Sequence, residues 1–222
     1  LGALATKFSK YGAIFNGAPN ELAPIRERRA GVQDEGSQLL AQIFATAAAE
    51  KEPWLDLCAG PGGKAALLSY LTQEALIANE ISETRARLVS RVLRNDGQVI
   101  NEDGRLLKLS DVGSVLADVP CTGLGALRRR PEIRWRRSPN DLPGLTKLQF
   151  ELAANAIDLI PTNGIFGFAT CSPHMAETRA QCASIEKKLS VEKIDVSEYL
   201  PTTLKDATVN GYMQLWPHRH GA

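Results

Sequence analysis

The sequence predicts an α/β fold in which a mostly parallel central sheet carries helices on both faces. From residue 53 onward, short apolar runs alternate with helical stretches, a pattern typical of β-α-β units. A glycine-rich turn joins the first apolar run to the helix that follows it. The length of 222 residues suits one large domain.

The elements can be assigned in order along the chain. The expected strands cover residues 53–58, 74–80, 113–119 and 164–171. The expected helices cover residues 34–50, 64–72, 82–96, 145–160 and 176–189. Ser82 is a suitable N-cap for the third helix, and Pro161 closes the fourth. Residues 1–34 are irregular and rich in glycine, proline and charge, so we expect an N-terminal extension that packs on a main domain of residues 35–222.

Composition indicates an ordinary globular protein. The chain is 44% hydrophobic and 23% charged, and its net charge is +1, which by itself does not favour nucleic acid. No apolar run reaches the length of a membrane span, and no signal peptide is visible. The four cysteines are not spaced like a metal site or an extracellular disulfide framework. We therefore expect a reduced cytoplasmic protein, without a metal and monomeric.

The turn LDLCAGPGGKAALL, residues 55–68, is a candidate ligand loop. Its glycines allow close approach of a ligand to the backbone at a helix N-terminus. The spacing matches neither a nucleotide-triphosphate loop nor the dinucleotide fingerprint G-x-G-x-x-G. A tight turn without a ligand is the plain alternative. Glu80 after the second strand and Asp103 after a presumed third strand favour a nucleoside pocket.

Two cysteines lie at the ends of predicted parallel strands. Cys121 follows LADVP and Cys171 follows IFGFAT, so both should reach the sheet edge that holds the glycine loop. A single cysteine is usually a small buried hydrophobe, and we accept that interpretation for Cys58 and Cys182. His174 is close to Cys171 in sequence but is equally consistent with an exposed turn.

Positive charge gathers directly after Cys121. The segment LRRRPEIRWRR contains six arginines, one acid and Trp135. A solvated charged loop is the ordinary interpretation of such a run. The indole among the arginines and the thiol upstream favour a nucleic-acid surface instead, although Trp135 is equally consistent with packing on a neighbouring helix.

Taken together, the motifs resemble those of the Fmu/Sun family of RNA (cytosine-5) methyltransferases. The matching segments are AGVQDEGSQ, LDLCAGPGGK, DGR, DVPCTGLGALRRRPEIRWRR and ATCSPHMAET, in this order over residues 30–180. The likeness is greatest to bacterial enzymes that act on cytosine in 16S ribosomal RNA. It implies a Rossmann-like fold of S-adenosylmethionine-dependent methyltransferases, with residues 35–222 as the catalytic domain. In the family an RNA-binding domain resembling the antitermination factor NusB usually precedes this domain, and we expect it to be absent from this chain.

The resemblance also implies roles for individual residues. Cys171 would attack carbon 6 of cytosine, Cys121 would assist elimination of the adduct, and Asp118 would contact the N3/N4 edge of the base. The residues implied for S-adenosylmethionine are Cys58, Ala59, Gly60, Pro61, Gly62, Gly63, Lys64, Glu80, Arg85, Asp103 and Asp118. Those expected to bind RNA beside a flipped base are Arg128, Arg129, Arg130, Arg134 and Trp135, and Arg26, Arg28 and Arg29 extend this surface.

Three other interpretations remain open from the sequence. A DNA cytosine-5 methyltransferase would use the cysteine of the PC motif, Cys121, as its nucleophile. A non-catalytic RNA-binding or ribosome assembly factor would keep the fold without the activity. A nicotinamide-dependent oxidoreductase would leave both cysteines and the arginines unexplained. Within the leading interpretation, another RNA such as tRNA is an alternative substrate to ribosomal RNA.

Overall fold

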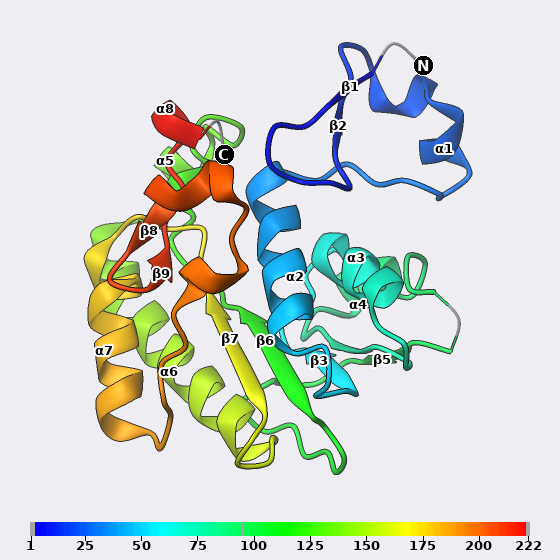
Figure 1. Cartoon of the computed structure of the whole chain (residues 1–222). Helices are drawn as coiled ribbons and strands as arrows, with labels where there is room; N and C mark the ends of the chain where they lie inside the picture. The colour runs from blue at the N-terminus through cyan, green and yellow to red at the C-terminus, as the bar shows by residue number, and fades with distance from the viewer. Residues whose placement is uncertain (1–2, 95, 221–222) are drawn as a thin grey trace.

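The centre of the protein is a five-stranded parallel sheet, seen in a computed structural model that describes residues 3–94 and 96–220 (Figure 1). The strands are β3 Trp54–Asp56, β4 Ile77–Asn79, β5 Gln98–Ile100, β6 Ser114–Asp118 and β7 Ile165–Ala169. Their order is β5-β4-β3-β6-β7, so the chain starts in the middle, moves outward, and then returns past β3. This reversal makes the carboxyl ends of β3 and β6 the edge where ligands bind in open α/β sheets. The predicted parallel sheet is confirmed.

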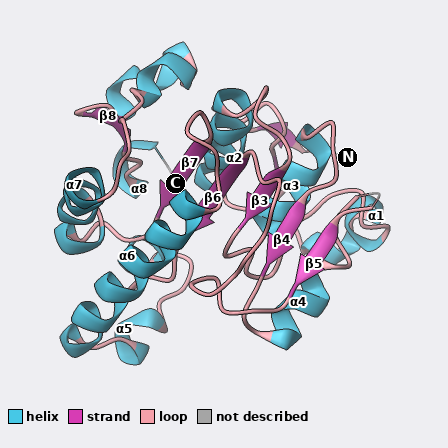
Figure 2. Ribbon diagram, turned by 90° about the horizontal axis from the view of Figure 1, so that it is seen from below, coloured by secondary structure: helices cyan, strands magenta, loops and turns pink. Residues whose placement is uncertain are grey.

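Helices cover both faces of this sheet, as predicted. The helices α2 Glu35–Ala47, α3 Gly63–Leu71 and α4 Glu83–Val89 contribute to one apolar core, and α6 Leu142–Asp158 contributes to the other. Figure 2 shows α2 and α6 on opposite sides of the strands. The buried residues Ala41, Phe44 and Ala45 of α2 and its C-cap residue Ala48 follow the i, i+3, i+4, i+7 spacing of one helix face. The last major helix, α7 Arg179–Lys188, packs beside α6.

Several of the predicted helices differ from the structure in extent: α2 ends at Ala47 instead of residue 50, and α6 starts at Leu142 instead of residue 145. The helix expected over residues 82–96 is wrong over residues 90–94, because the chain turns there to place Val92 over Gly62 and to let the Arg94 N–H donate to Ser69 Oγ at 2.7 Å; residue 95 lies outside the described residues. Ser82 is the N-cap residue, although its side chain makes no capping bond. The helix expected from residue 176 begins at Arg179, since Met175–Glu177 form a separate 3-10 turn.

The N-terminal segment lies to one side of the sheet. Its elements are β1 Leu4–Ala5, β2 Ala13–Ile14, a 3-10 turn at Pro19–Glu21 and α1 Ala23–Arg26, seen at the upper right of Figure 1. Phe8 is buried in a small cluster with Leu39 of α2 and Leu204. The backbone N–H of Ser9 donates to the carboxylate of Glu35 at 2.8 Å. Residues 8 and 9 thus attach this segment to α2.

Shorter elements complete the described chain. Between β6 and α6 lie a 3-10 turn at Leu124–Ala126, α5 Ile133–Arg136 and a 3-10 turn at Pro139–Asp141. After α7 come 3-10 segments at Val196–Tyr199 and Thr202–Ala207, strands β8 Thr208–Val209 and β9 Tyr212–Met213, and α8 Pro217–His220. Within residues 3–94 and 96–220, no helix combines the length and apolarity that crossing a membrane requires.

Gly113 directly before β6 is closely packed, and Gly144 in α6 provides a matched control in open space. A Cβ on Gly113 would lie 2.3 Å from the Lys51 carbonyl oxygen, whereas a Cβ on Gly144 in α6 would meet nothing within 4 Å. We expect Gly113→Ala to lower the free energy of unfolding by about 1–3 kcal/mol through overpacking. Gly144→Ala should raise it by about 0.5–1 kcal/mol, since alanine favours the helix. Urea denaturation measures both, and equal midpoints for the two variants would contradict the packing described here.

Candidate active site

The pairing of β6 with β7 brings two thiols together. The strands run parallel and in register up to the pair Asp118 and Ala169, and each continues for two or three residues to a cysteine. The Sγ atoms of Cys121 and Cys171 are 3.5 Å apart, a hydrogen-bond distance for sulfur. Cys121 is buried and Cys171 is exposed. One sulfur can therefore meet a ligand while the other supports it from behind.

The two thiols have opposite acidities. The hydrogen bond from Cys121 lowers the pKa of Cys171 to about 7; Lys64 acts in the same direction, whereas burial and Asp118 oppose it. The same hydrogen bond, together with burial, raises the pKa of Cys121. At neutral pH, Cys171 thus carries a large share of thiolate while Cys121 keeps its proton. The thiolate is the nucleophilic form of cysteine.

A half-buried ion pair lies next to the thiols. Lys64, in the first turn of α3, reaches the end of β6, where its Nζ is 2.5 Å from the Asp118 carboxylate. Lys64 also donates to Ser37 Oγ on α2 at 3.3 Å. Burial disfavours the charged amine, but the Asp118 carboxylate outweighs that effect and raises the pKa of Lys64. The pair fixes the Asp118 carboxylate by linking α3 to β6.

The glycine loop has the backbone geometry of a close-approach turn. Gly60 and Gly62 have φ values of +58° and +101°, in the left-handed region that favours glycine. A Cβ on Gly62 would lie 2.6 Å from Val92 Cγ2. Gly63 begins α3, so the loop leads directly into the N-terminus of that helix. Cys58 is half-buried in this loop, and burial raises the pKa of its thiol.

Acidic residues follow the strands along this edge. Glu80 follows β4, is almost fully buried, and pairs with Arg85 at 2.6 Å. Asp103 lies after β5 and pairs with Arg105 at 2.6 Å. The hydrogen bonds from Arg105 hold the pKa of Asp103 below its usual range. With Asp118 after β6, the edge presents carboxylates from three strands to a ligand.

Asp56 is a further acid at this edge that the sequence analysis did not select. It ends β3, is 1% exposed, and neither of its carboxylate oxygens has a hydrogen-bond partner in the described chain. Burial raises its pKa to about 7, against the opposing effect of nearby Lys64. An unpaired buried carboxylate of this kind calls for a cationic or hydrogen-bond-donating neighbour. The signal was present in LDLC, where an acid interrupts a buried apolar strand.

These features fit a cofactor such as S-adenosylmethionine. That molecule carries ammonium and sulfonium cations and a ribose with two hydroxyl groups, which suit carboxylates. The unpartnered oxygens of Asp56 and the left-handed glycines at 60 and 62 are the observations that match it. Among the described residues, no cluster of three or more histidine, cysteine or acidic side chains could hold a metal ion.

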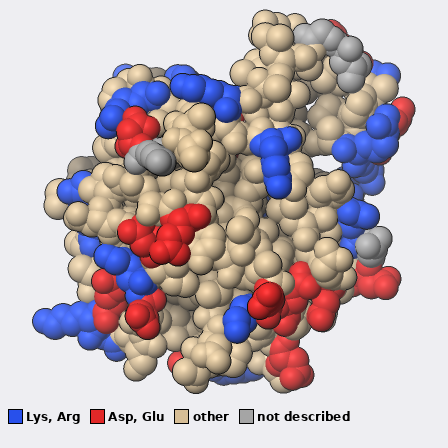
Figure 3. Space-filling view, viewed as in Figure 1, with Lys and Arg blue, Asp and Glu red and all other residues tan. Residues whose placement is uncertain are grey.

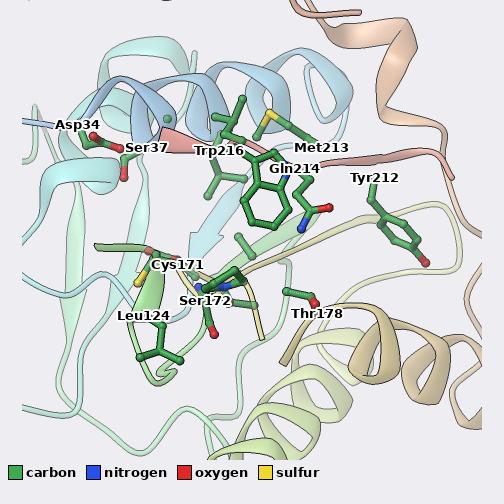
Figure 4. Close-up of a pocket in the computed structure, with 18 of the residues that line it drawn as sticks. Asp34, Ser37, Leu124, Cys171, Ser172, Thr178, Tyr212, Met213, Gln214 and Trp216 are labelled. Atoms are coloured by element: carbon green, nitrogen blue, oxygen red, sulfur yellow. Dashed lines mark hydrogen bonds between the residues drawn. The ribbon is translucent and has the colours of Figure 1, made fainter. Parts of the chain in front are cut away.

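Cys171 opens into a cavity of about 470 Å³ (Figure 4). Cys171, Ser172 and Leu124 lie on one side of it, and Met213, Gln214 and Trp216 of the C-terminal segment lie on the other. Asp34 and Ser37 of α2 and the arginines Arg128 and Arg129 also line the cavity. The accessible thiol therefore faces a half-open cavity with arginines at its border.

The predicted RNA-binding residues lie together on one side of this cavity. Lys and Arg side chains gather at the upper left in Figure 3, over the region where α5 and α8 lie in Figure 1. Arg129 pairs with Asp34 at 2.8 Å, and Arg130 pairs with Glu132 at 3.3 Å. Trp135 is 77% exposed, so the alternative in which its indole packs on a neighbouring helix is wrong.

Other sequence candidates are placed away from the thiol pair. His174 is exposed, and its Nδ1 accepts the backbone N–H of Ala176, as expected for a turn residue. Cys182 lies on α7, is half-buried, and lines the same cavity as Cys171 without contacting the thiol pair. Arg26 at the end of α1 donates to the carbonyl of Glu21, and Arg29 pairs with Glu27. These N-terminal arginines therefore make local contacts within their own segment.

Comparison with known proteins places this site in a family. The model of the family described as 16S rRNA methyltransferase RsmB/F matches residues 43–222. The chain belongs to this family. The Mycobacterium tuberculosis protein Rv1407 is 46% identical over 213 residues, covering 92% of this chain and 46% of that protein. The ribosomal RNA small subunit methyltransferase B of Pseudomonas putida is 32% identical, covering 78% of this chain and 42% of that protein. The chain thus spans less than half the length of these curated relatives.

Solved structures confirm the fold. PH0851 matches with a TM-score of 0.81 at 22% identity, covering 99% of this chain and 51% of that chain. NSun6 from Pyrococcus horikoshii, solved with SFG, matches with a TM-score of 0.73 at 19% identity, covering 92% of this chain and 53% of that chain. The RsmB/F chain described here has the Rossmann-like fold of S-adenosylmethionine-dependent methyltransferases, as the resemblance implied.

The unequal thiols predict a distinctive pH dependence of alkylation. Because the thiolate reacts and the pKa of Cys171 is about 7, its rate with iodoacetamide should rise with pH and reach half its maximum near pH 7. Cys121→Ala removes the hydrogen bond that lowers this pKa, so its midpoint should move toward the ordinary value for cysteine, about 8.5. Peptide mass spectrometry at each pH follows Cys171 alone. An unchanged midpoint in Cys121→Ala would show that the two thiols do not interact.

Proposed function

We propose that this RsmB/F chain methylates carbon 5 of a cytosine in RNA, with 16S ribosomal RNA as the substrate. The observation that carries this proposal is the pair of thiols 3.5 Å apart at the ends of β6 and β7, beside Asp118 and the glycine loop. Family membership supports an RNA substrate, and the cytosine-specific chemistry follows from what two thiols and a carboxylate can do together.

Cys171 is the nucleophile in this proposal. Carbon 5 of cytosine is a poor nucleophile until a group adds to carbon 6, and a thiolate performs that addition. The Cys171 sulfur forms a bond to carbon 6, and the electron pair of the 5,6 double bond shifts toward carbon 5. The lowered pKa of Cys171 supports this assignment over Cys121, whose thiol stays protonated. The DNA-type alternative, with the nucleophile in the PC motif, is disfavoured for the same reason.

Asp118 and Cys121 act on the base while it is attached to Cys171. The Asp118 carboxylate, held by Lys64, contacts the N3/N4 edge and stabilises the positive character that the ring gains when N3 is protonated. After methylation, water takes the proton on carbon 5, and the electron pair of that carbon–hydrogen bond re-forms the 5,6 double bond. That pair expels the Cys171 thiolate, and Cys121 assists this elimination from its position beside the sulfur.

The cofactor pocket is assigned to the strand ends and the glycine loop. S-adenosylmethionine supplies the methyl group when it is bound there. Residues 58–64 would surround its methionine portion, Glu80 with Arg85 would hold the ribose, Asp103 would bind the adenine, and the Asp56 carboxylate would favour its positive charge. The buried, unpartnered carboxylate of Asp56 supports a cationic ligand at this position.

The arginine segment holds the RNA. Extracting a base from its stack costs a few kcal/mol, which contacts to phosphates offset. Arg128 and Arg129 border the cavity that contains Cys171, and Arg130 and Arg134 are exposed beside it. The exposed indole of Trp135 provides a stacking surface for a neighbouring base.

Trapping with RNA that contains 5-fluorocytosine tests the chemistry. Fluorine at carbon 5 blocks the final elimination, so the native protein should form a stable covalent complex in the presence of S-adenosylmethionine. Cys171→Ala should form none. Cys182→Ala removes a third thiol that lines the same cavity and keeps both active-site thiols, so this control should still form the complex. With ordinary RNA, Cys121→Ala should accumulate a stalled complex. Denaturing gel electrophoresis detects each species, and a complex that persists in Cys171→Ala refutes the proposed nucleophile.

Salt dependence tests the RNA surface. Each arginine that neutralises a phosphate of single-stranded RNA contributes about 0.7 to the slope of log affinity against log salt. Arg130→Ala with Arg134→Ala should therefore weaken binding and flatten the slope by about 1.4. Lys147→Ala with Lys187→Ala removes equal charge from exposed positions on α6 and α7 and is the control. Fluorescence anisotropy at several salt concentrations distinguishes the two pairs; identical slopes would exclude α5 from the interface.

A further inference from the structure

A fully buried carboxylate lies directly behind the two thiols. Glu177 is 0% exposed and comes from the 3-10 turn between β7 and α7. One of its oxygens accepts the backbone N–H of Thr122 at 2.8 Å, and the other accepts the Thr122 hydroxyl. Thr122 is the residue next to Cys121. The carboxylate is thus bonded twice to the end of the Cys121 loop.

The same carboxylate is tied to the other cysteine loop and to a helix. Ser172, which follows Cys171, places its hydroxyl 3.0 Å from the Thr122 hydroxyl and hydrogen-bonds the carboxylate. Gln149 of α6 donates from Nε2 to Glu177 at 3.0 Å and to the Pro120 carbonyl at 2.9 Å. Glu177 therefore joins the residues adjacent to both cysteines to one rigid helix.

Burying an ionised carboxylate at this position costs free energy unless hydrogen bonds compensate for the lost contact with water. Burial disfavours the ionised carboxylate, yet hydrogen bonds from Ser172, Thr122 and Gln149 outweigh burial and lower the pKa of Glu177. Gln149 itself occupies a core position, since it continues the i, i+3, i+4, i+7 series of Leu152, Ala153 and Ala156 on α6. An apolar residue would ordinarily stand there. Glu177 and Gln149 are thus buried polar residues whose hydrogen bonds reach the cysteine loops.

We propose that Glu177 is a positioning residue that holds the Cys121 and Cys171 loops at the spacing at which one thiol donates to the other. The inference deepens the proposed function and rests on its assignment of the two thiols. Glu177 contacts neither sulfur in this arrangement and acts through Thr122 and Ser172. A second link, from the Gly125 N–H to the Cys171 carbonyl at 2.9 Å, closes the two loops on the opposite side.

The test measures the acidity of Cys171 in the full chain without RNA or cofactor. Glu177→Gln keeps the shape but removes the charge that gathers the donors, so Cys121 should no longer be held against Cys171. The midpoint of iodoacetamide alkylation at Cys171 should rise by about one pH unit, which lowers the rate at pH 7 about fivefold. An unchanged midpoint would overturn the inference.

A double-mutant cycle shows whether Glu177 acts through Cys121. In a Cys121→Ala background the hydrogen bond to Cys171 is already lost, so adding Glu177→Gln should leave the alkylation profile unchanged. An equal further shift would place the action of Glu177 elsewhere and overturn the inference. This readout needs no methyl transfer, so failure of the proposed function would leave it intact, and the two failures are distinguishable.

Two further variants separate positioning from general stability. Asn155 is a buried polar residue on α6, the helix that carries Gln149, and it donates to the Gly104 and Leu107 carbonyls. Asn155→Ala should therefore lower the free energy of unfolding without moving the pH midpoint of Cys171 alkylation. If Glu177→Gln does not fold, Thr122→Val removes one hydroxyl from the network at nearly constant shape. Thr122→Val should raise the midpoint and Thr122→Ser should restore it. Equal midpoints in these two variants would overturn the inference.

Discussion

The hydrogen bond between two thiols is the interaction on which this site depends. This bond lowers the pKa of Cys171 and raises the pKa of Cys121. The exposed sulfur of Cys171 therefore carries negative charge near neutral pH, while the buried sulfur of Cys121 keeps its proton. Neither cysteine has a histidine partner, and His174 lies in an exposed turn. In the proposed mechanism, a second thiol with Lys64 in support therefore takes the activating role that an imidazole has in other cysteine enzymes.

The surroundings of that bond are unusually polar for the centre of an α/β domain. Asp56, Lys64, Asp118 and Glu177 are all wholly or largely withdrawn from water. Three of them have partners within the chain, and Asp56 has none among the described residues. Partnered charges stiffen the strand ends, whereas the sealed Asp56 carboxylate is disfavoured as a charge, and burial raises its pKa to about 7. The edge of the sheet is thus fixed on the thiol side and holds a carboxyl group without a side-chain partner next to the glycine loop.

Sequence reasoning reached the sheet, its helices and the thiol pair because these depend on local patterns. Alternation of apolar runs with helical periods is visible without knowing any contact, and a cysteine after each of two buried strands implies their meeting at one edge. The end of α4 at Val89 was not predictable, since it depends on Val92 packing over Gly62 in another segment. Asp56 and Glu177 were missed for a related reason, because the sequence alone does not show whether an acidic residue is exposed to solvent or buried. Likewise, only the tertiary structure shows whether the Trp135 indole packs against a helix or extends into solvent.

The register of β6 against β7 has a consequence for how this chain can change. Ser114 is opposite Ile165 and Asp118 is opposite Ala169; from that last pair, three residues lead to Cys121 and two lead to Cys171. One inserted or deleted residue within either strand would displace its cysteine by about 3.3 Å and turn it to the other face of the sheet. Length variation in homologues is therefore tolerable at the far ends of these strands, around residues 107–112 and 161–163, but not between those points and the thiols.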